Sequence, residues 1–251
     1  MHHIFVNKNL INDNLIKISS KEDRKNFFHL KKSLRINVNE NILVSVIPFT
    51  FTYDYLSIVK YISEDEIILE ILESIESNET KFTINLFQGI PKNDKFEFII
   101  EKAVELGVSN IYPVNMDFSI SKILKENKIE RYKNIALSAS EQSKRNIIPT
   151  VHTPINFSDM IKTILDSKSK YNMLFYEKEN DISKTKKYID NIKCSDNNII
   201  NIIIGPEGGF SEKEIKNVVS NNIEILSLGK RILRTETASI VALSILMFYT
   251  E

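Results

Sequence analysis

The chain has 251 residues, with 33 basic and 33 acidic side chains, so its formal net charge is zero. Hydrophobic residues make up 42% of it and charged residues 26%, which is typical of a globular protein and excludes a disordered or collagen-like chain. The single cysteine, Cys194, excludes a disulfide framework and a cysteine-bound metal cluster.

Targeting segments are not recognisable in the sequence. The start, MHHIFV, lacks the charged and then apolar layout of a signal peptide. The longest apolar stretch near the C-terminus, residues 238–249, is about half as long as a membrane span. We therefore expect a soluble, cytoplasmic protein.

The zero net charge hides an uneven distribution. Residues 1–36 hold eight basic and three acidic residues, a balance of +5, whereas residues 37–79 hold one basic and nine acidic residues, a balance of −8. Such asymmetry is typical of a basic binding face beside an acidic solvated one, although two ordinary charged surfaces would give the same pattern.

Residues 1–75 predict a small β-rich domain. Segments rich in β-branched and aromatic residues predict strands at 42–47, 55–62 and 67–72. One short helix is predicted between Ser20 and Leu34, with Ser20 as its N-cap and Asp23 as the capping-box partner. Several strands with one helix favour a β-barrel-like domain.

From residue 81 the pattern alternates between strands and helices. Strands are predicted at 82–87, 111–114, 173–176, 199–204 and 223–228, and helices at 91–106, 126–142, 156–167, 211–221 and 235–249. Pro91 opens the first of these helices and Gly107 ends it. This order predicts an α/β domain with a mostly parallel sheet, and the polar segment 76–80 divides the chain into domains 1–76 and 77–251.

A glycine-rich loop follows one predicted strand, in the sequence IIIGPEGGFSEKEI at 202–215. Ser211 and Glu214 form a capping box for the next helix. Because ligands bind at the carboxyl ends of parallel strands, Gly205 and Gly208 favour close approach to a ligand, although a tight turn without a ligand fits too. The loop lacks the phosphate-loop ending and the dinucleotide glycine spacing, and Glu207 would repel a phosphate, so a cationic or neutral ligand is favoured.

A second such loop lies in LSLGKRILRTETASIVA at 226–242, where a strand ends near Gly229. Thr235 or Thr237 is predicted to cap the following helix. The two loops could form two walls of one pocket. Arg234 beside Glu236 could be a surface pair, or its guanidinium could hold a phosphate or a developing negative charge. The other glycines, Gly89 and Gly107, fit ordinary roles at a strand end and a helix stop.

Two basic segments fit contacts with RNA. FHLKKSLR at 28–35 interleaves basic residues with aromatics and a histidine, which suits backbone contact and base stacking, although an amphipathic surface helix is the alternative. ASEQSKR at 139–145 is a polar helix end, and such ends are commonly only solvated. The four histidines lack metal-ligand spacing, so no metal site is expected, and His152 is expected in a structural role.

These motifs resemble those of the RsmE-type ribosomal RNA methyltransferases, which belong to the knotted SPOUT class. The resemblance rests on GPEGGFSEKE followed by LGKRILRTETA, and it extends over nearly the whole chain through MHHIFV, FHLKKSLR, LFQGIPKNDKFEFIIEKAVELGVSNIYPV and EQSKR with Pro149. Lys144 stands where many members carry a glycine.

The resemblance implies a PUA-like N-terminal barrel that helps to hold RNA and a C-terminal α/β domain with a trefoil knot. It also implies a homodimer that binds S-adenosylmethionine and methylates N3 of a uridine in 16S ribosomal RNA of the small subunit. The knot comes from the resemblance alone, because knots are rare in general.

The resemblance also implies which residues form the site. The cofactor is expected against Tyr176, Glu177, Ile204, Gly205, Pro206, Glu207, Gly208, Leu228, Gly229, Ile232, Leu233 and Thr237. RNA is expected against Arg24, His29, Lys31, Arg35, Gln142 and Arg145. Arg234 is expected to stabilise the uracil anion or to place its phosphate, with Glu236 or Glu141 as proton acceptor.

Two other functions remain open at this point. One is a ribosome-associated RNA-binding factor of the same fold that has lost catalysis, which the intact cofactor loops disfavour. The other is a nucleotide-using α/β enzyme, which the missing phosphate loop disfavours.

Overall fold

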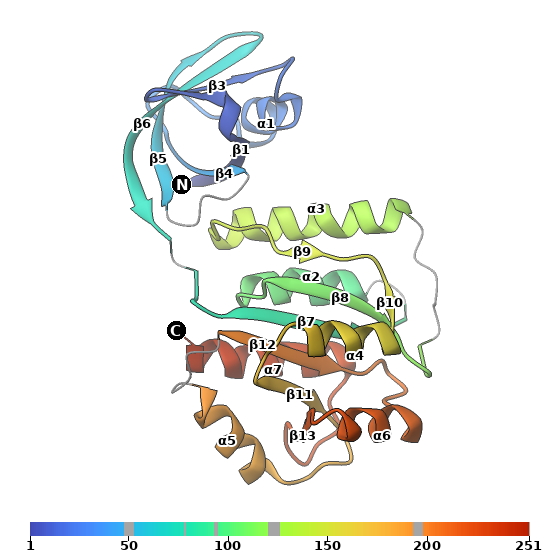
Figure 1. The fold of residues 1–251 in the computed structure, drawn as a ribbon. Coiled ribbons are helices and arrows are strands. Elements are labelled where there is room, and N and C mark those ends of the chain that lie inside the picture. The colour runs from blue at the N-terminus through green and yellow to red at the C-terminus, as the bar shows by residue number, and fades with distance from the viewer. Residues whose placement is uncertain (48–52, 78, 93–94, 120–125, 193–197, 251) are drawn as a thin grey trace. The chain divides into compact units, whose positions relative to one another are not determined.

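The computed structural model describes residues 1–47, 53–77, 79–92, 95–119, 126–192 and 198–250. Contacts divide the chain into two compact units (Figure 1). The first comprises Met1–Glu79 with Ser140–Ile147, and the second comprises Thr80–Ala139 with Ile148–Glu251.

The first unit is built on a curled, mixed six-stranded sheet in the order β1-β4-β5-β6-β3-β2. Its elements are β1 (His2–Asn7), η1 (Lys8–Leu10), β2 (Ile11–Asn12), β3 (Leu15–Ser19), α1 (Arg24–Phe28), η2 (His29–Leu34), β4 (Asn41–Ile47), β5 (Tyr53–Ile62) and β6 (Glu66–Glu76). β1 and β4 pair in parallel and the other neighbours are antiparallel. Register shifts between β5 and β6 bend these two long strands, because a bulge increases the local twist.

The helix of this unit begins later than the sequence predicted. α1 starts at Arg24, and its N-cap is Asp23, whose carboxylate accepts the N–H of Asn26. Ser20 was the predicted cap and is not, because its hydroxyl and N–H both donate to Asp65. A capping oxygen must face the first turn of its helix. The sequence analysis predicted a helix that begins too early, and it therefore assigned the cap to Ser20 wrongly.

The second unit has a parallel sheet in the order β10-β8-β7-β12-β11-β13, with β9 paired to β8. Its elements are β7 (Thr83–Gly89), α2 (Lys95–Glu105), β8 (Asn110–Asn115), α3 (Glu126–Ser143), β9 (Thr150–Val151), β10 (Ile155–Asn156), α4 (Phe157–Asp166), β11 (Tyr171–Phe175), α5 (Ile182–Asp190), β12 (Ile199–Ile204), α6 (Glu212–Ser220), β13 (Glu224–Leu226) and α7 (Thr235–Thr250). The α/β class with a parallel sheet is therefore confirmed. Sequence analysis missed α5, β9 and β10.

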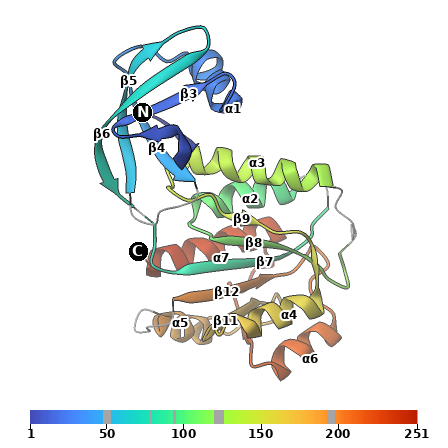
Figure 2. The ribbon, with the colours of Figure 1, turned by 45° about the horizontal axis from the view of Figure 1, so that its top comes forward.

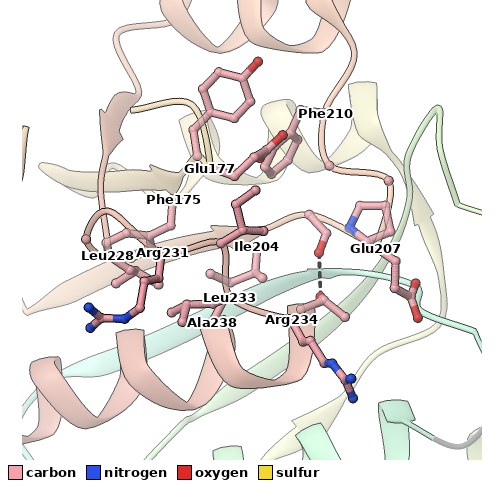
Figure 3. A pocket seen from close by; sticks show the side chains of 18 residues that line it. Phe175, Glu177, Ile204, Glu207, Phe210, Leu228, Arg231, Leu233, Arg234 and Ala238 are labelled. Atoms are coloured by element: carbon pink, nitrogen blue, oxygen red, sulfur yellow. Dashed lines mark hydrogen bonds between the residues drawn. The ribbon is translucent and has the colours of Figure 1, made fainter. Parts of the chain in front are cut away.

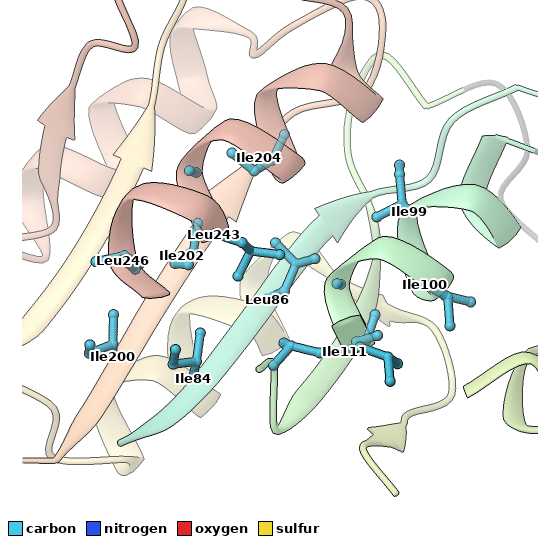
Figure 4. Close-up of a cluster of buried hydrophobic side chains, with 14 of the residues drawn as sticks. Ile84, Leu86, Ile99, Ile100, Ile111, Ile200, Ile202, Ile204, Leu243 and Leu246 are labelled. Atoms are coloured by element: carbon cyan, nitrogen blue, oxygen red, sulfur yellow. The ribbon is translucent and has the colours of Figure 1, made fainter. Parts of the chain in front are cut away.

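Helices cover both faces of this sheet (Figure 2). One face packs against α2, α3, α5 and α7, through a cluster that includes Ile84, Leu86, Ile200, Ile202 and Leu243 (Figure 4). The other face packs against α4 and α6 through Phe87, Ile203 and Met160. Strand residues alternate between the faces, so a strand buried on both sides is apolar throughout, as IINIII in β12 is.

A row of buried asparagines crosses the sheet near the start of its strands. Asn110 donates to Asn85, Asn85 donates to Asn201, and Asn201 donates to Asn172, with N···O distances of 2.7–2.9 Å. These residues face one another in register on four neighbouring strands. A one-residue slip would bury unpaired amides, so the row helps to fix the register.

Candidate active site

A cavity of about 410 Å³ opens at the carboxyl ends of β11 and β12, and the segment that follows β13 forms one side of it (Figure 3). It is lined by Phe175, Tyr176, Glu177, Ile204, Gly205, Pro206, Glu207, Gly208, Gly209, Phe210, Leu228, Gly229, Arg231, Ile232, Leu233, Arg234, Thr235 and Ala238. Figure 3 shows the charged ends of Arg231, Arg234 and Glu207 at the edge of this group of residues. The size and the mixed lining suit a small-molecule ligand.

The first wall is the loop from Gly205 to Phe210, and two of its glycines have close neighbours. A side chain at Gly205 would lie 3.0 Å from the ring of Phe210. Gly209 has φ +70°, and a side chain there would lie 2.5 Å from a carboxylate oxygen of Glu177. The positive φ of Gly209 therefore disfavours any other residue there, and a side chain at Gly205 would have to displace the ring of Phe210.

The capping box predicted after this loop is confirmed. Ser211 caps α6 by accepting the N–H of Glu214 at 3.2 Å, and the Glu214 carboxylate accepts the N–H of Ser211 at 2.9 Å. Glu214 is only 3% exposed. The end of the first wall is thus fixed to a helix N-terminus.

The second wall runs from Leu228 to Arg234 and is held by α5. Thr185 donates its hydroxyl to the carbonyl of Ser227 and accepts the N–H of Ser227, both at 2.9 Å. Gly229, at φ +117°, donates its N–H to the Ser227 hydroxyl at 3.1 Å. Ile232 lines the cavity and is 82% exposed, so it lies at the rim.

A buried polar network lies under both walls. Gln88, at the end of β7, donates to the Thr235 hydroxyl at 2.9 Å and to the Gly205 carbonyl at 3.5 Å. Its carbonyl oxygen accepts the Ser239 hydroxyl at 2.5 Å, and Thr235 itself donates to Gly205 at 2.6 Å. Gln88 and Ser239 are fully buried. The network ties the end of β7 to the Gly205 loop and to the first turn of α7.

This arrangement corrects the predicted cap of α7. The helix begins at Thr235, so neither Thr235 nor Thr237 precedes it. The hydroxyl of Thr235 is used by Gly205 instead. Gly89 ends β7, as predicted, and the structure gives it a further role. A side chain at Gly89 would lie 2.5 Å from the backbone nitrogen of Pro206, so the first wall rests on it.

A charged cluster lies beside the first wall. Lys95 contacts the carboxylates of Glu207 at 3.3 Å and Glu236 at 3.4 Å. Although partial burial acts to raise it, hydrogen bonds from backbone N–H groups, including that of Lys92, and the Lys95 ammonium hold the pKa of Glu207 below its ordinary value. One oxygen of Glu236 is buried and accepts no hydrogen bond from the described residues.

Comparison with known proteins assigns this site to a family. The sequence profile of the RNA methyltransferase domain matches residues 78–247, which include both walls of the cavity. The chain belongs to this family. The methyltransferase is 35% identical to the ribosomal RNA small subunit methyltransferase E of Mesomycoplasma hyopneumoniae (strain 232) over 227 residues, 89% of this chain and 95% of that protein.

Solved structures agree with this assignment. The methyltransferase is similar to a ribosomal RNA small subunit methyltransferase E from Neisseria gonorrhoeae bound to S-adenosyl methionine, with a TM-score of 0.81, 27% identity and coverage of 99% and 97% of the two chains. A putative methyltransferase from Legionella pneumophila, also in complex with that cofactor, has a TM-score of 0.80, 27% identity and coverage of 98% and 96%.

The predicted cofactor residues converge on the cavity. All of them except Thr237 line it. Thr237 lies in the first turn of α7, outside the lining. The lining also contains residues that the sequence analysis did not select as cofactor contacts, namely Phe175, Phe210, Arg231, Thr235 and Ala238.

The predicted catalytic residues are separated. Arg234 lines the cavity, and Glu236 lies in the charged cluster beside it. Glu141 belongs to the other unit, where burial raises the pKa of its carboxyl and Lys25 opposes that shift. The structure brings Arg234 and Glu236 into one unit and leaves Glu141 outside it.

The predicted RNA contacts fall into two kinds. Arg24, Arg35 and Gln142 are exposed, and Arg24 lies 5.7 Å above the ring of Phe28. His29 is half-buried, and burial, with His2 and Lys25, lowers its pKa. These side chains are accessible to a large ligand.

Two other predicted RNA contacts, Arg145 and Lys31, form hydrogen bonds within the first unit. Arg145 is 6% exposed and binds both oxygens of Glu79, with a shortest N···O distance of 2.6 Å. Lys31 donates to the carbonyls of Ser63 and Glu64 at 2.8 and 3.1 Å. These placements suit structural roles better than contact with RNA, which for both residues stays a prediction.

Other expectations are answered in part. His152 stacks on Tyr112 at 3.9 Å and contacts Asn110 at 3.1 Å, which confirms a structural role. Lys144 has φ +58°, a left-handed conformation that favours glycine, the residue that the resemblance led us to expect there. Cys194 lies outside the described residues.

In the part of the chain that the structure describes, no helix is long and apolar enough to cross a membrane.

Proposed function

We propose that this chain transfers the methyl group of S-adenosylmethionine to N3 of a uridine in the 16S ribosomal RNA of the small ribosomal subunit. The observation that carries the proposal is the cavity between two motif loops at the carboxyl ends of the parallel strands. Relatives and neighbouring structures support it, since they are named as small-subunit ribosomal RNA methyltransferases and as complexes with this cofactor.

The residues that line the cavity fit S-adenosylmethionine. Ile204, Leu228 and Leu233 offer an apolar slot for the adenine ring, and the glycine loops expose backbone groups beside it. Glu177 and Glu207 supply negative charge at the lining, which suits a sulfonium cation and opposes a nucleotide triphosphate. When bound, the cofactor supplies an electrophilic methyl group.

Arg234 is suited to bind the uracil base that accepts the methyl group. N3 of uracil is a weak acid between two carbonyl groups, and it must lose its proton to attack a methyl group. Arg234 lines the cavity, and its guanidinium can stabilise the negative charge that develops on the uracil carbonyls or can hold the phosphate of the nucleotide.

Glu236 is the better candidate for the proton acceptor. Its side chain is 16% exposed, and the buried Oε2 that lies 3.4 Å from the Lys95 ammonium accepts no hydrogen bond from the described residues. It lies in the same unit as the cavity, whereas Glu141 does not. An acceptor close to the substrate needs no long-range proton transfer.

The first unit is proposed to hold RNA. Phe28 carries two basic neighbours, since Arg24 lies 5.7 Å and Lys32 4.7 Å from its ring centroid, and Lys31 lies 5.3 Å from the ring centroid of the adjacent Phe27. This grouping of positive charge and aromatic surface suits phosphate contact and base stacking. The trefoil knot, the PUA-like relationship of this unit and the cytoplasmic location stay predictions from the resemblance and the sequence.

A homodimer is also part of the proposal. From Ala238 to Tyr249, helix α7 has no charged residue and is apolar on all sides apart from Ser239 and Ser244, although of its residues only Thr235, Ser239, Ala242, Leu243 and Leu246 are buried. Phe248, on its last turn, is 77% exposed. A helix that is apolar all round is ordinarily buried all round, so the uncovered face of α7 favours a second copy of the chain as its cover.

The direct test uses the purified protein, S-adenosylmethionine and small ribosomal subunits from cells that lack this gene. We expect methyl transfer, N3-methyluridine in the digested RNA and loss of that nucleoside from the deletion strain. Arg234→Ala should lower kcat about 100-fold or more, the usual cost of removing one donor to a developing anion. Arg131→Ala is the matched control, since Arg131 is exposed on α3 and contacts Glu97.

Two results would contradict the proposal. An unchanged nucleoside profile in the deletion strain would exclude this reaction. Absence of S-adenosylmethionine binding in calorimetry would support the non-catalytic RNA-binding alternative, which the intact cavity disfavours.

A further inference from the structure

Phe118 is a half-exposed aromatic residue beside the candidate active site. It follows β8, and 50% of its surface is exposed. Its Cβ packs against Gly208 so closely that a side chain at Gly208 would lie only 2.7 Å from it. Gly208 lines the cavity and Phe118 does not, so Phe118 packs against the first wall from outside the lining. The close packing of Phe118 thus explains why residue 208, the second glycine of GPEGG, is a glycine.

The segment that carries Phe118 is firmly held on both sides of it. Ser119 and Met116 exchange hydrogen bonds, with the Ser119 N–H on the Met116 carbonyl at 3.0 Å and the Met116 N–H on the Ser119 hydroxyl at 3.2 Å. Asp117 donates its N–H to Glu214 at 2.9 Å and accepts the hydroxyl of Ser211 at 2.5 Å. The turn is therefore fixed to the same capping box that ends the first wall.

We propose that a base of the RNA substrate stacks on the ring of Phe118 when the target nucleotide enters the site. This inference rests on the proposed function. A nucleotide whose base undergoes chemistry leaves its stack, and the lost stacking is replaced by aromatic side chains of the enzyme. Phe118 offers a half-exposed apolar ring beside Gly208 of the first wall, on a turn that is anchored through Asp117.

The position of Phe118 distinguishes it from an ordinary exposed apolar residue and favours a role in binding a base. Scattered exposed apolar side chains need no explanation by themselves. Phe118 differs from them because its neighbours Met116 and Ser119 are 1% and 6% exposed and the segment is anchored through Asp117. The fold has fixed the backbone at this place and left the ring in solvent, next to the cavity.

A fluorescence measurement tests this contact directly. The chain has no tryptophan, so Phe118→Trp introduces a single reporter at the proposed contact. Small ribosomal subunits from cells that lack this gene should quench its fluorescence, because an indole stacked on a base loses emission. Phe98→Trp is the matched control: Phe98 is 46% exposed on α2 of the same unit, and its fluorescence should not change beyond the optical effect of the RNA.

Kinetics provide the second measurement. Phe118→Ala should raise KM for the subunit about tenfold or more, the usual effect of removing one stacking partner, while the Kd for S-adenosylmethionine stays within about twofold. Phe118→Tyr keeps a ring and should restore KM. Phe98→Ala should leave both constants unchanged.

The outcomes separate this inference from the proposed function. Methyl transfer by Phe118→Trp without quenching would overturn the stacking contact and leave the reaction in place. Quenching without methyl transfer by the wild type would support the contact and contradict the reaction. Dissociation of a dimer by Phe118→Ala would make the ring part of an interface between copies and would overturn the inference.

Discussion

Gly89 shows how one missing side chain positions the active site. Its backbone lies against Pro206, where an added Cβ would be 2.5 Å from both the ring Cδ and the backbone nitrogen. Neither atom can move without moving the first wall of the cavity. The sequence showed a glycine at a strand end, but it could not show that another loop crosses it there.

We therefore expect Gly89→Ala to damage the cavity. The extra methyl group forces the Pro206 loop away, at a cost of roughly 1–3 kcal/mol of stability. Calorimetry should show a loss of S-adenosylmethionine affinity beside a lower Tm. Gly107→Ala is the control: nothing lies within 4 Å of its added side chain, and its φ of +81° costs about 1 kcal/mol at the end of α2. Equal affinities of the two variants would contradict this role of Gly89.

His3 makes the first unit sensitive to acid. It is 4% exposed, and its Nε2 lies 2.7 Å from the hydroxyl of Ser45, which in turn donates to Asp54. Burial, opposed by backbone groups of Glu141 and Ser140 and assisted by Lys144, lowers the pKa of His3 from 6.5 to about 4. In the unfolded chain the imidazole takes up a proton near pH 6.5, whereas the folded chain does so only near pH 4.

The free energy of unfolding should therefore fall as the pH drops from about 6.5 towards 4. The contribution of His3 amounts to about 2 kcal/mol between pH 7 and pH 5. Burial raises the pKa of Asp54, which acts in the opposite sense and reduces the net loss. Urea unfolding at the two pH values measures the effect, and His3→Gln should flatten it. An equally steep dependence in His3→Gln would assign it to other groups.

At the scale of elements, one hydrogen-bonded network joins three of them under the cavity. Gln88 of β7, Gly205 after β12 and Thr235 of α7 are distant in sequence and are connected by bonds of 2.6–3.5 Å. Sequence analysis named LFQGIP as part of a motif, but it gave Gln88 no role. The signal was a polar residue inside an otherwise apolar strand, TINLFQG.

Replacing Gln88 by leucine should weaken both stability and cofactor binding. The network loses the bonds of Gln88 to Thr235, Gly205 and Ser239. Ser239 keeps its bond to the Thr235 carbonyl at 3.0 Å and Thr235 keeps its bond to Gly205, so the cost is that of the lost hydrogen bonds, about 1 kcal/mol each. Asn85→Leu is the matched control: Asn85 lies in the same strand, but its bonds to Asn110 and Asn201 belong to the asparagine row. Only Gln88→Leu should lower S-adenosylmethionine affinity, and equal loss in both variants would contradict the assignment.

At the scale of the whole molecule, the expected dimer can be measured. Sedimentation should give about 58 kDa, twice the chain mass of 29.0 kDa. Phe248→Glu places a charge on the uncovered face of α7 and should shift the species to 29 kDa, because a buried unpaired charge is costly. Leu165→Glu, at a position 50% exposed on α4, is the control. A wild-type monomer would exclude this part of the proposal.

Much of the architecture was predictable from local patterns. The strands of β7, β8 and β12 and the helices α4, α6 and α7 were found within a few residues of their bounds, because apolar periodicity and caps are local signals. The short β9 and β10 were missed because two residues carry no periodicity. Helix α5 was missed because its solvent-facing lysines obscure the apolar positions.

The sequence by itself determined the class of the fold, the two glycine loops and, through its resemblance to a family, the residues that line the cavity. Those features depend on residue type and spacing along the chain. Only the tertiary structure decided that β7 lies beside β12, that Gly89 supports Pro206 and that Phe118 packs against Gly208. These contacts join residues far apart in sequence, and sheet order and loop packing depend on the summed burial of the whole unit rather than on any local pattern.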